Sequence, residues 1–332
     1  MTAPRVGVVG AGTIGRTHLN AYRDAGAVPI AVTDIDQAAA EAAANEFGLT
    51  VFPDAATMFR EADLEAVSIC TPPAGHADAA VLALDAGIPV LCEKPMARTV
   101  AECDAMIIAA RRSGTLLTVG HCHRFQPQIE AMKSLIADGR IGTPLTFRNR
   151  FSGPLDRVEA RWFSRREVSG GGALMDTSVH SIDIFRYLIG EIDQIVAVTA
   201  TTATERGPAL EVEDSSVLAV RSTEWVLGVI EASWRTAPGE ALVSVSGTQG
   251  RLDFDYDTSN LSLIAADGSV AAIDVPPGNR FTRQASNFLG SIANGTQPRV
   301  AASDGARAVA LLAQAYASAG PLSSTTAKGR RQ

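Results

Sequence analysis

Short apolar runs alternate with helix-like segments over the first 120 residues of the chain. Val6-Gly7-Val8-Val9 is continuously apolar, which is typical of a strand that is covered on both faces. Strands that alternate with helices of about 10–15 residues predict βαβ units and a parallel sheet. The predicted strands are residues 6–9, 29–34, 66–70, 88–92 and 115–119, and the predicted helices are residues 13–25, 37–47, 75–86 and 100–112.

The pattern changes after residue 140. One helix-like stretch follows Gly172 and ends near Gly190, and runs of β-forming residues separated by turns come after it. Successive strands with short connections predict an antiparallel sheet. The predicted strands are residues 193–203, 215–221, 225–234, 241–246, 251–256 and 260–265, and two helices follow at 282–294 and 303–318. We therefore expect two α/β domains, residues 1–121 and 122–320, and a disordered tail at 321–332.

The segment Gly10-Ala11-Gly12-Thr13-Ile14-Gly15 joins the first predicted strand to the first predicted helix. In such a loop Gly10 permits a tight turn, Gly12 lets the backbone approach a pyrophosphate, and Gly15 lets the helix pack closely on the strand. The N–H groups at the start of the helix then face the phosphates. This context predicts a Rossmann-type dinucleotide-binding domain, although a glycine-rich turn without a ligand is the alternative for the motif alone.

An aspartate ends the second predicted strand. A carboxylate at Asp34 can accept hydrogen bonds from both ribose hydroxyls of a dinucleotide, and it repels a 2′-phosphate. Asp34 and Asp36 both precede a helix, so each is also a candidate N-cap. We expect Asp36 to be the cap and Asp34 the ribose ligand, which favours NAD over NADP.

Lysine is rare in this chain, with Lys94, Lys133 and Lys328 the three lysines among 29 basic residues. Lys94 stands in Glu93-Lys94-Pro95, directly after a predicted parallel strand, where doubly wound folds bind their ligands. Its amino group is a compact charge with rotatable donors. A surface Glu–Lys pair is the alternative, and the sequence leaves the isomer of the Pro95 peptide open.

A narrow polar line runs along the helix predicted after Gly172. At 100° per residue, Asp176, His180, Asp183 and Tyr187 fall within about 60° of one another, and apolar residues fill much of the rest. We expect the line to face a water-filled cavity. Asp176 can orient His180 and keep it basic near neutral pH, so that His180 takes a hydroxyl proton. A core histidine with an aspartate cap is the alternative.

Composition excludes several classes of function. The 332 residues carry a net charge of −7 without a basic stripe, so we expect no nucleic-acid partner. No apolar run approaches the roughly 18 residues of a membrane helix, and the N-terminus resembles no export signal. We therefore expect a cytoplasmic protein, in which the four cysteines are reduced packing residues.

Two places in the chain offer candidate metal ligands. His180 with Asp176, or the stretch His121-Cys122-His123, could supply ligands. Neither has a third ligand at suitable spacing, so we expect no metal.

Five motifs follow one another along nearly the whole chain. They are Gly10-Ala11-Gly12-Thr13-Ile14-Gly15-Arg16-Thr17-His18; Thr71-Pro72-Pro73 with His76; Glu93-Lys94-Pro95; Val119-Gly120-His121 with Arg124-Phe125 and Pro127; and Gly170-Gly171-Gly172 with Asp176, His180 and Asp183. In this order the motifs resemble those of the Gfo/Idh/MocA family, named for glucose–fructose oxidoreductase, inositol dehydrogenase and a rhizopine catabolism protein. The stretch His121-Cys122-His123 is less typical of the family.

The resemblance implies more than the residues show by themselves. The second domain would carry a large open sheet that commonly joins subunits into homodimers or homotetramers. Lys94 would position and polarise the substrate hydroxyl, and His180 would be the main acid/base, assisted by Asp176. Substrates of the family are mostly sugars, sugar derivatives and cyclitols. The loop residues Gly10, Gly12, Thr13, Ile14 and Gly15 with Asp34 would bind the adenosine and pyrophosphate part of NAD, and Thr71, Pro72, His76, Glu93 and Lys94 would line its nicotinamide half.

We therefore expect an NAD-dependent dehydrogenase that oxidises a secondary hydroxyl of a sugar, sugar derivative or inositol. Further candidate substrate contacts are Arg124, Arg148, Arg150, Trp162 and Arg166, since Arg and Trp suit polyols or acidic groups. A solvated or packing role is the alternative for each. Three other functions stay open: a reductase of a non-sugar carbonyl, a glycosidase that uses bound NAD for a transient oxidation, and an NAD-sensing regulator without turnover.

Overall fold

The structure is a computed structural model that describes residues 3–156, 158, 161–201 and 210–320. The chain forms two compact units, here called the first unit (Met1–Gln126 with Pro277–Val309) and the second unit (Pro127–Pro276 with Ala310–Gln332). The tail predicted at 321–332 lies outside the described residues. Within the described ranges, none of the helices has the length and apolar character needed to cross a membrane.

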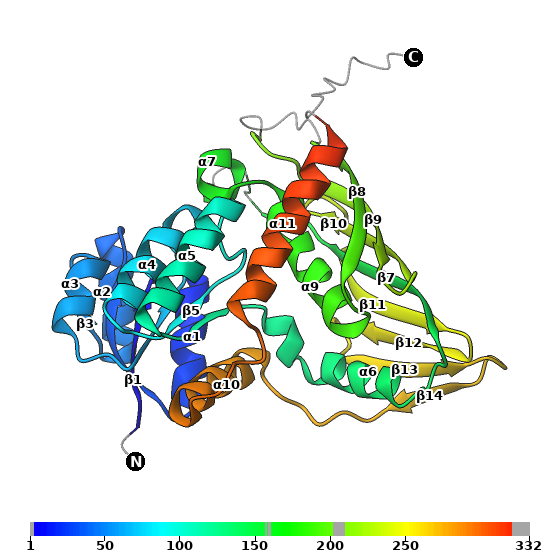
Figure 1. Ribbon diagram of the computed structural model, residues 1–332, viewed down its shortest axis with the longest axis horizontal. Helices are drawn as coiled ribbons and strands as arrows, with labels where there is room; N and C mark the ends of the chain where they lie inside the picture. Colours follow the sequence, from blue (N-terminus) through cyan, green and yellow to red (C-terminus); the bar gives the residue numbers. More distant parts are fainter. Residues whose placement is uncertain (1–2, 157, 159–160, 202–209, 321–332) are drawn as a thin grey trace. The chain divides into compact units, whose positions relative to one another are not determined.

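The first unit contains a six-stranded sheet in the order β3-β2-β1-β4-β5-β6 (Figure 1). Every neighbouring pair is parallel, which confirms the predicted Rossmann-type fold. The edge strand β3 was not predicted, because two residues are too short to show a hydrophobic pattern. The strands are β1 (Arg5–Val9), β2 (Val28–Thr33), β3 (Thr50–Val51), β4 (Ala66–Ile69), β5 (Val90–Cys92) and β6 (Leu117–Val119).

Helices cover both faces of this sheet and bury its apolar strands. One face packs against α1, α2 and α10. The other face packs against α3, α4 and α5 and against the start of α11. The helices are α1 (Thr13–Asp24), α2 (Gln37–Phe47), α3 (Ala55–Glu61), α4 (His76–Asp85), α5 (Val100–Ser113), α10 (Arg280–Asn294) and α11 (Ala302–Ala319), with the short 3₁₀ helices η1 (Pro73–Gly75) and η2 (Cys122–Phe125).

Residues 277–309 belong to the first unit, whereas the boundaries expected from the sequence put them in the second domain. In α10, Phe288 and Leu289 are buried in one cluster with Val6 and Tyr22. The apolar stripe of α10 shows that the helix needs a partner, but the sequence does not say which core supplies it. Helix α11 starts in the first unit, and its later residues, from Ala310 onward, belong to the second.

The second unit contains an eight-stranded sheet in the order β14-β13-β12-β11-β7-β10-β9-β8. All neighbouring strands are antiparallel except β7 and β10, which are parallel. This confirms the predicted large, mainly antiparallel sheet. The strands are β7 (Pro144–Ser152), β8 (Ile192–Ala200), β9 (Ser215–Ser222), β10 (Leu227–Ser233), β11 (Glu240–Gly247), β12 (Gly250–Asp255), β13 (Asn260–Ala265) and β14 (Val270–Ile273).

Strand β7 lies in the middle of this sheet but was not predicted. Its centre reads Arg148-Asn149-Arg150, which looks like a polar loop. Asn149 is fully buried, and its amide donates a 2.7 Å hydrogen bond to the carbonyl of Leu242. Arg148 and Arg150 alternate with it on the other face, where both contact Glu231. A central strand can therefore be polar when one face of its sheet is open.

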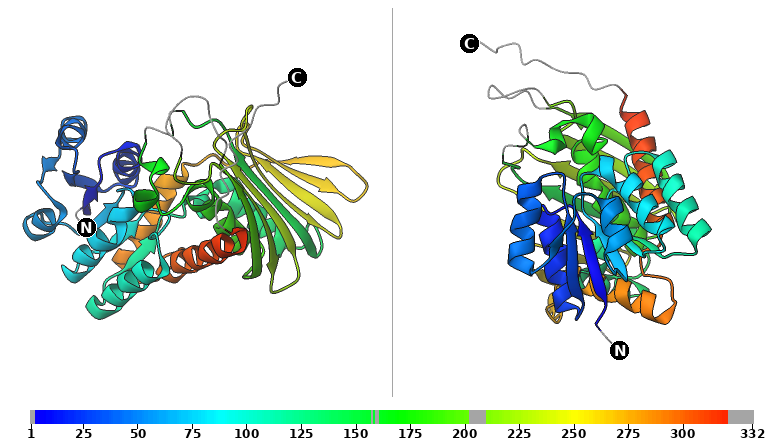
Figure 2. Two further views of the ribbon diagram at one scale, coloured as in Figure 1. Left: turned by 90° about the horizontal axis from the view of Figure 1, so that it is seen from above. Right: turned by 90° about the vertical axis from the view of Figure 1, so that its left-hand side faces the viewer.

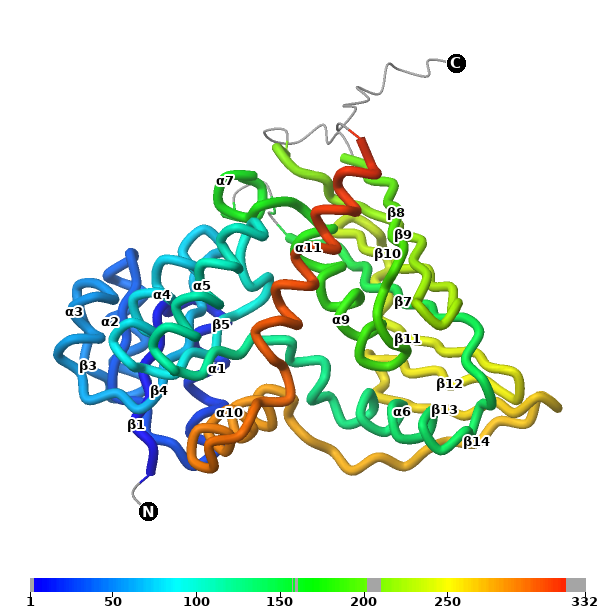
Figure 3. Tube along the Cα trace, viewed as in Figure 1, coloured from blue at the N-terminus to red at the C-terminus, as the bar shows by residue number. Residues whose placement is uncertain are grey.

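Helices cover only one face of the eight-stranded sheet, as Figure 2 shows. The ring of Phe185 in α9 meets Phe147 of β7 edge-on at 5.1 Å. A Cβ at Gly228 would lie 2.9 Å from the Phe185 ring, so this glycine lets α9 pack closely. The helices of this unit are α6 (Pro127–Ala137), α7 (Arg166–Ser169), α8 (Ala173–Asp176) and α9 (Ser178–Leu188), with the 3₁₀ helix η4 (Trp162–Ser164), and Figure 3 traces the chain through them.

Candidate functional site

The glycine loop has the geometry that a dinucleotide requires. Gly10 has a φ of +99°, and a Cβ there would lie 2.7 Å from the backbone of Cys70. A Cβ at Gly15 would overlap the carbonyl oxygen of Gly10, so only glycine lets α1 pack here. Gly12 faces open space, with nothing within 4 Å of its Cβ position. Gly10 and Gly15 therefore have the steric roles that the motif predicts, while the contact of Gly12 with a pyrophosphate stays a prediction.

Helix α1 begins at this loop without a side chain that caps it. Its N-cap is Gly12, which makes no side-chain cap bond, and the first turn, with Thr13 and Ile14, contains no acidic residue. Unclaimed N–H groups and the positive end of the helix dipole favour an anion. The chain's own residues thus fit the pyrophosphate of NAD.

Asp34 lies beside this loop at the end of β2. Its Oδ2 accepts a 2.6 Å hydrogen bond from the Ala11 N–H, and its Oδ1 accepts one from the Asp36 N–H at 2.8 Å. Asp36 caps α2 by accepting from the N–H groups of Ala38 and Ala39. Asp36 is thus the helix cap, as predicted, and the ribose contact of Asp34 stays a prediction. Each Asp34 oxygen keeps a second lone pair for a ribose hydroxyl.

Thr71, Pro72 and His76 follow β4 and surround the start of α4. The ring of His76 is buried, with Nε2 2.7 Å from the carbonyl oxygen of Thr71 and Nδ1 2.9 Å from that of Pro95. Burial lowers the pKa of His76 although these carbonyls favour its charged form. His76 thereby ties the segment after β4 to the segment after β5. The Oγ1 of Thr71 is buried without a hydrogen-bond partner in the described part of the chain, so it is available to a ligand.

Lys94 follows β5 as predicted, and its peptide bond to Pro95 is cis. The preceding Glu93 is 5% exposed. Its Oε1 lies 2.9 Å from Nε2 of His18, and its Oε2 accepts a 3.1 Å bond from the Lys94 N–H. His18 ends the first motif of the sequence analysis, where no role was predicted for it. Its place three residues after Gly15, on the same helix, is the signal that could have drawn attention to it.

The residues after β6 form η2 and are buried. Arg124 pairs with Asp304, with 3.1 Å between Nη1 and Oδ2, so its guanidinium holds the start of α11. Burial, together with the positive charges of Arg280 and Lys94, lowers the pKa of His123 well below its usual value. The substrate contact expected of Arg124 stays a prediction.

In the second unit, the helix predicted after Gly172 is two helices. Helix α8 ends at Asp176, and α9 begins at Ser178. Thr177 lies between them, and its hydroxyl accepts a 3.0 Å bond from the Trp234 indole N–H. Asp176 and His180 are therefore not on one continuous helix, whereas the sequence predicted a single helix after Gly172. The break at Thr177 could not be predicted, because the helical spacing of polar and apolar residues continues across it.

The polar line survives this break. Asp176, His180 and Tyr187 are half-buried, while the apolar residues Ile182 and Phe185 are fully buried. Asp183 departs from the expectation, because it is 1% exposed.

A buried carboxylate that was not predicted holds the start of α8. Oε1 of Glu213 accepts from the N–H groups of Gly172 and Leu174 at 2.9 and 3.0 Å and from the Tyr316 hydroxyl at 2.6 Å. A Cβ at Gly172 would overlap the carbonyl oxygen of Glu213, which explains the last glycine of the motif. Burial raises the pKa of Glu213.

Trp162 lies in η4 and is half-buried. Its ring stacks on that of Phe163, with 3.8 Å between the centroids. One face of the indole is therefore occupied, and its substrate contact stays a prediction.

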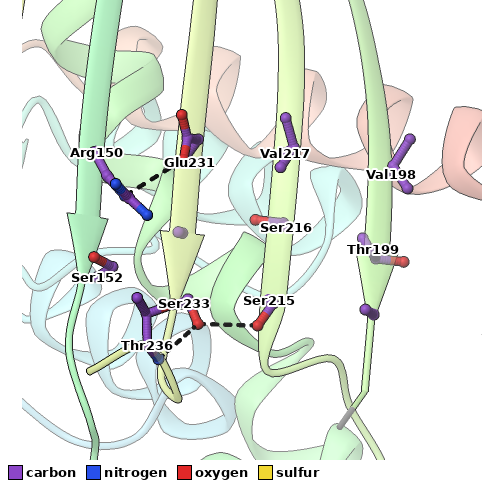
Figure 4. A pocket seen from close by; sticks show the side chains of 12 residues that line it. Arg150, Ser152, Val198, Thr199, Ser215, Ser216, Val217, Glu231, Ser233 and Thr236 are labelled. Atoms are coloured by element: carbon purple, nitrogen blue, oxygen red, sulfur yellow. Dashed lines mark hydrogen bonds and ion pairs between the residues drawn. The ribbon is translucent and has the colours of Figure 1, made fainter. Parts of the chain in front are cut away.

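A shallow hollow of about 240 Å³ lies on the open face of the eight-stranded sheet (Figure 4). Arg150 pairs with Glu231 there, and the hydroxyls of Ser215 and Ser233 are hydrogen bonded to each other. The hollow contains none of the candidate catalytic or cofactor-binding residues. Arg150, a candidate substrate contact, lines it, and that contact stays a prediction.

Comparison with known families matches both parts of the chain. Residues 4–121 match the family described as oxidoreductase, NAD-binding Rossmann fold, and residues 129–253 match the GFO/IDH/MocA C-terminal domain. The chain belongs to the GFO/IDH/MocA oxidoreductase family. It is accordingly an NAD-dependent oxidoreductase, and the predicted family, enzyme class and cofactor are confirmed.

Relatives of this GFO/IDH/MocA chain extend over nearly its whole length. It is 30% identical to the D-apiose dehydrogenase of Paraburkholderia graminis, over 94% of this chain and 86% of that protein. It is 30% identical to the inositol 2-dehydrogenase of Rhizobium meliloti, over 92% and 94%. Among solved structures, a levoglucosan dehydrogenase in complex with NADH and levoglucosan has a TM-score of 0.89, with 26% identity over 96% of this chain and 97% of that one.

Proposed function

We propose that this chain oxidises a secondary hydroxyl of a sugar, a sugar derivative or an inositol with NAD as the electron acceptor. The observation that carries the proposal is that relatives named for such substrates match the chain almost end to end. Lys94 at the end of β5 and His180 near the start of α9 supply the groups that an alcohol oxidation needs.

Each of these side chains has one step in the proposed reaction. Lys94 orients the hydroxyl and stabilises negative charge that develops on its oxygen. His180 removes the hydroxyl proton, and Asp176 assists by favouring the protonated imidazole. Bound NAD supplies the nicotinamide ring that accepts the hydride.

Cofactor binding is assigned to the residues of the first unit that fit it. The glycine loop with Thr13 and Ile14 takes the pyrophosphate, and Asp34 takes the ribose hydroxyls. Thr71, Pro72, His76, Glu93 and Lys94 line the nicotinamide half. Replacement of Asp34 by Ser removes the carboxylate that repels a 2′-phosphate, so NAD binds more weakly and the preference over NADP falls. Dissociation constants from NADH and NADPH fluorescence test this, and an unchanged preference would contradict it.

A substrate panel tests the proposed activity directly. Inositols, hexoses, sugar acids and anhydrosugars are each incubated with NAD and, in parallel, with NADP, and the formation of reduced cofactor is followed by absorbance. Turnover of at least one polyol or sugar with NAD supports the proposal. Cofactor that stays tightly bound without net NADH release, together with cleavage of a glycoside, would favour the NAD-dependent glycosidase instead.

A homodimer or homotetramer through the eight-stranded sheet is part of the proposal. Val198, Val217 and Leu227 on its open face are 74%, 50% and 58% exposed. A broad apolar face of this kind favours self-association. Light scattering should find an oligomer for the parent chain and a smaller species for Val198→Glu. A monomeric parent chain would contradict this part.

A further inference from the structure

Four buried polar side chains of the first unit form a hydrogen-bonded chain. Nε2 of His18 lies 2.9 Å from Oε1 of Glu93, and Nδ1 lies 2.9 Å from Oγ of Ser68. That oxygen lies 2.7 Å from the hydroxyl oxygen of Tyr22. We call these four residues the His18 cluster.

The cluster joins three elements that carry candidate site residues. His18 and Tyr22 lie on the buried side of α1, the helix that begins at the glycine loop. Ser68 lies in β4, and Glu93 directly follows β5. A single imidazole ring therefore links the helix that follows the phosphate loop to the segment that carries Lys94.

The contacts of the ring favour its charged form. Burial opposes a charge on His18, but Cys70 and Glu93 raise its pKa, whereas His18 and Lys94 lower the pKa of Glu93 against the same burial. Among the described residues, the titratable neighbours of the His18 ring are Cys70, Glu93 and Tyr22. An imidazolium donates from both nitrogens, so Glu93 and Ser68 both act as acceptors.

Glu93 also contacts the backbone of Lys94, so the pairing of Glu93 with His18 restrains the position of Lys94. Its second oxygen, Oε2, accepts the N–H of Lys94 at 3.1 Å. The carboxylate has little room, because a Cβ at Gly120 would lie 2.5 Å from Oε1. Any rotation of the Glu93 carboxylate would therefore remove one of its two partners, the charged ring of His18 or the backbone N–H of Lys94.

We propose that His18 is a positioning residue for Lys94, which it holds through the Glu93 carboxylate at the end of β5. The proposal rests on the role of Lys94 in the function proposed above. The same contacts support a proton relay less well. The chain of hydrogen bonds ends at Tyr22, which is 0% exposed and gives no path to solvent.

Lysine labelling tests the proposal without a substrate. The parent, His18→Gln, His18→Leu and Tyr22→Phe chains are acylated briefly at pH 8, and mass spectrometry gives the ratio of modified Lys94 to modified Lys133. Loss of the imidazolium leaves the negative charge of Glu93 unbalanced beside Lys94 and favours its unreactive ammonium form, so we expect the ratio to fall about threefold in both His18 variants. Tyr22→Phe, which removes only the far hydroxyl, should keep the parental ratio.

Kinetics on the full chain give a second readout. Displacement of Lys94 should lower kcat about 10- to 100-fold in the His18 variants. KM for NAD should change much less than kcat, because the glycine loop that takes the pyrophosphate is unchanged although Lys94 lines the nicotinamide half. A structural role alone would lower the midpoint of thermal unfolding and leave the labelling ratio unchanged.

Each outcome decides a separate question. A parental ratio in folded His18→Gln overturns the positioning role, as does an equal fall in Tyr22→Phe. If His18→Leu does not fold, His18→Gln alone decides. A lower ratio with no turnover of any polyol in the parent supports the positioning role and contradicts the proposed function.

Discussion

Glu93 and Glu213 are both buried glutamates that hold the backbone next to a candidate catalytic residue, but their partners differ. Glu93 is paired with the imidazole of His18 and accepts the Lys94 N–H. Among the described residues, the donors to Glu213 are neutral: two backbone N–H groups and the Tyr316 hydroxyl. The pKa of Glu93 is lowered despite burial, and that of Glu213 is raised by burial. The Glu93 carboxylate must be charged to keep its partner, whereas the Glu213 carboxyl group tolerates a proton.

The largest expected effect comes from removing the candidate catalytic residues themselves. Lys94→Ala and His180→Ala should each lower kcat by about 10²- to 10⁴-fold, the usual loss for an acid/base or charge-stabilising group. Steady-state NADH formation with the best substrate of the panel measures it. Arg60→Ala, which alters an exposed ion pair with Glu61, is the control. Near-parental turnover in both variants would remove the two residues from the site.

Breaking the charged pair should cost the most stability. Glu93→Gln leaves the imidazolium of His18 without its counter-charge in a buried site, so the free energy of unfolding should fall by about 3–5 kcal/mol. Urea unfolding at pH 7, followed by circular dichroism, gives the value. A loss under about 1 kcal/mol would mean that His18 is neutral and that the two glutamates are alike.

The neutral site should tolerate the same substitution. Glu213→Gln keeps an oxygen that accepts from Gly172 and Leu174, and we expect a loss of about 1 kcal/mol in the free energy of unfolding. Glu213→Leu removes the acceptor from all three donors and should cost more. The same urea experiment ranks the two variants. Equal losses in Glu93→Gln and Glu213→Gln would erase the distinction.

The mildest test compares pH dependence. The folded pKa of His18, raised from 6.5 to about 10, means that its contribution to stability is fully present below pH 6.5 and is lost as the pH rises through 10. For Glu213, with a folded pKa raised above 4.5, the contribution is present below pH 4.5 and is lost as the pH rises through the folded value.

The difference in free energy of unfolding between the parent and each variant, measured from pH 4 to pH 10.5, separates these windows. The difference from His18→Gln should shrink steadily as the pH rises from about 6.5 to about 10. The difference from Glu213→Gln should begin to change near pH 4.5 and go on changing until the pH passes the raised pKa of Glu213. A common window for both would contradict the assignment of charge.

The sequence predicted those parts of the site that depend on neighbours in the chain. Gly10, Gly12 and Gly15 lie where the motif requires them, because each acts within one turn between a strand and a helix. The location of Lys94 follows from the end of a single strand. Partners that are distant in sequence were not predictable: His18 meets Glu93 across 75 residues, and Arg124 meets Asp304 across 180.

The fold was predicted to a similar extent and for a similar reason. Apolar periodicity identified five of the six strands in the first unit and the helices α1, α2, α4 and α5. It missed β7, since the polar Asn149 is buried there by a bond to Leu242, and it missed the break at Thr177. Neither feature follows from periodicity: Asn149 is buried by a bond to another strand, and Thr177 contacts Trp234, which is 57 residues away in the chain.

The parallel pairing of β7 with β10 has a consequence for how the second unit forms. Strands β8 to β10 and β11 to β14 can each pair as ribbons of neighbours along the chain, but β7 must close a loop of more than 70 residues before it meets β10. Such distant pairing slows folding. Helices α8 and α9 lie inside that loop. Phe185 of α9 packs on both β7 and β10, so the helix that carries the candidate proton acceptor finds its full packing surface only after that loop has closed.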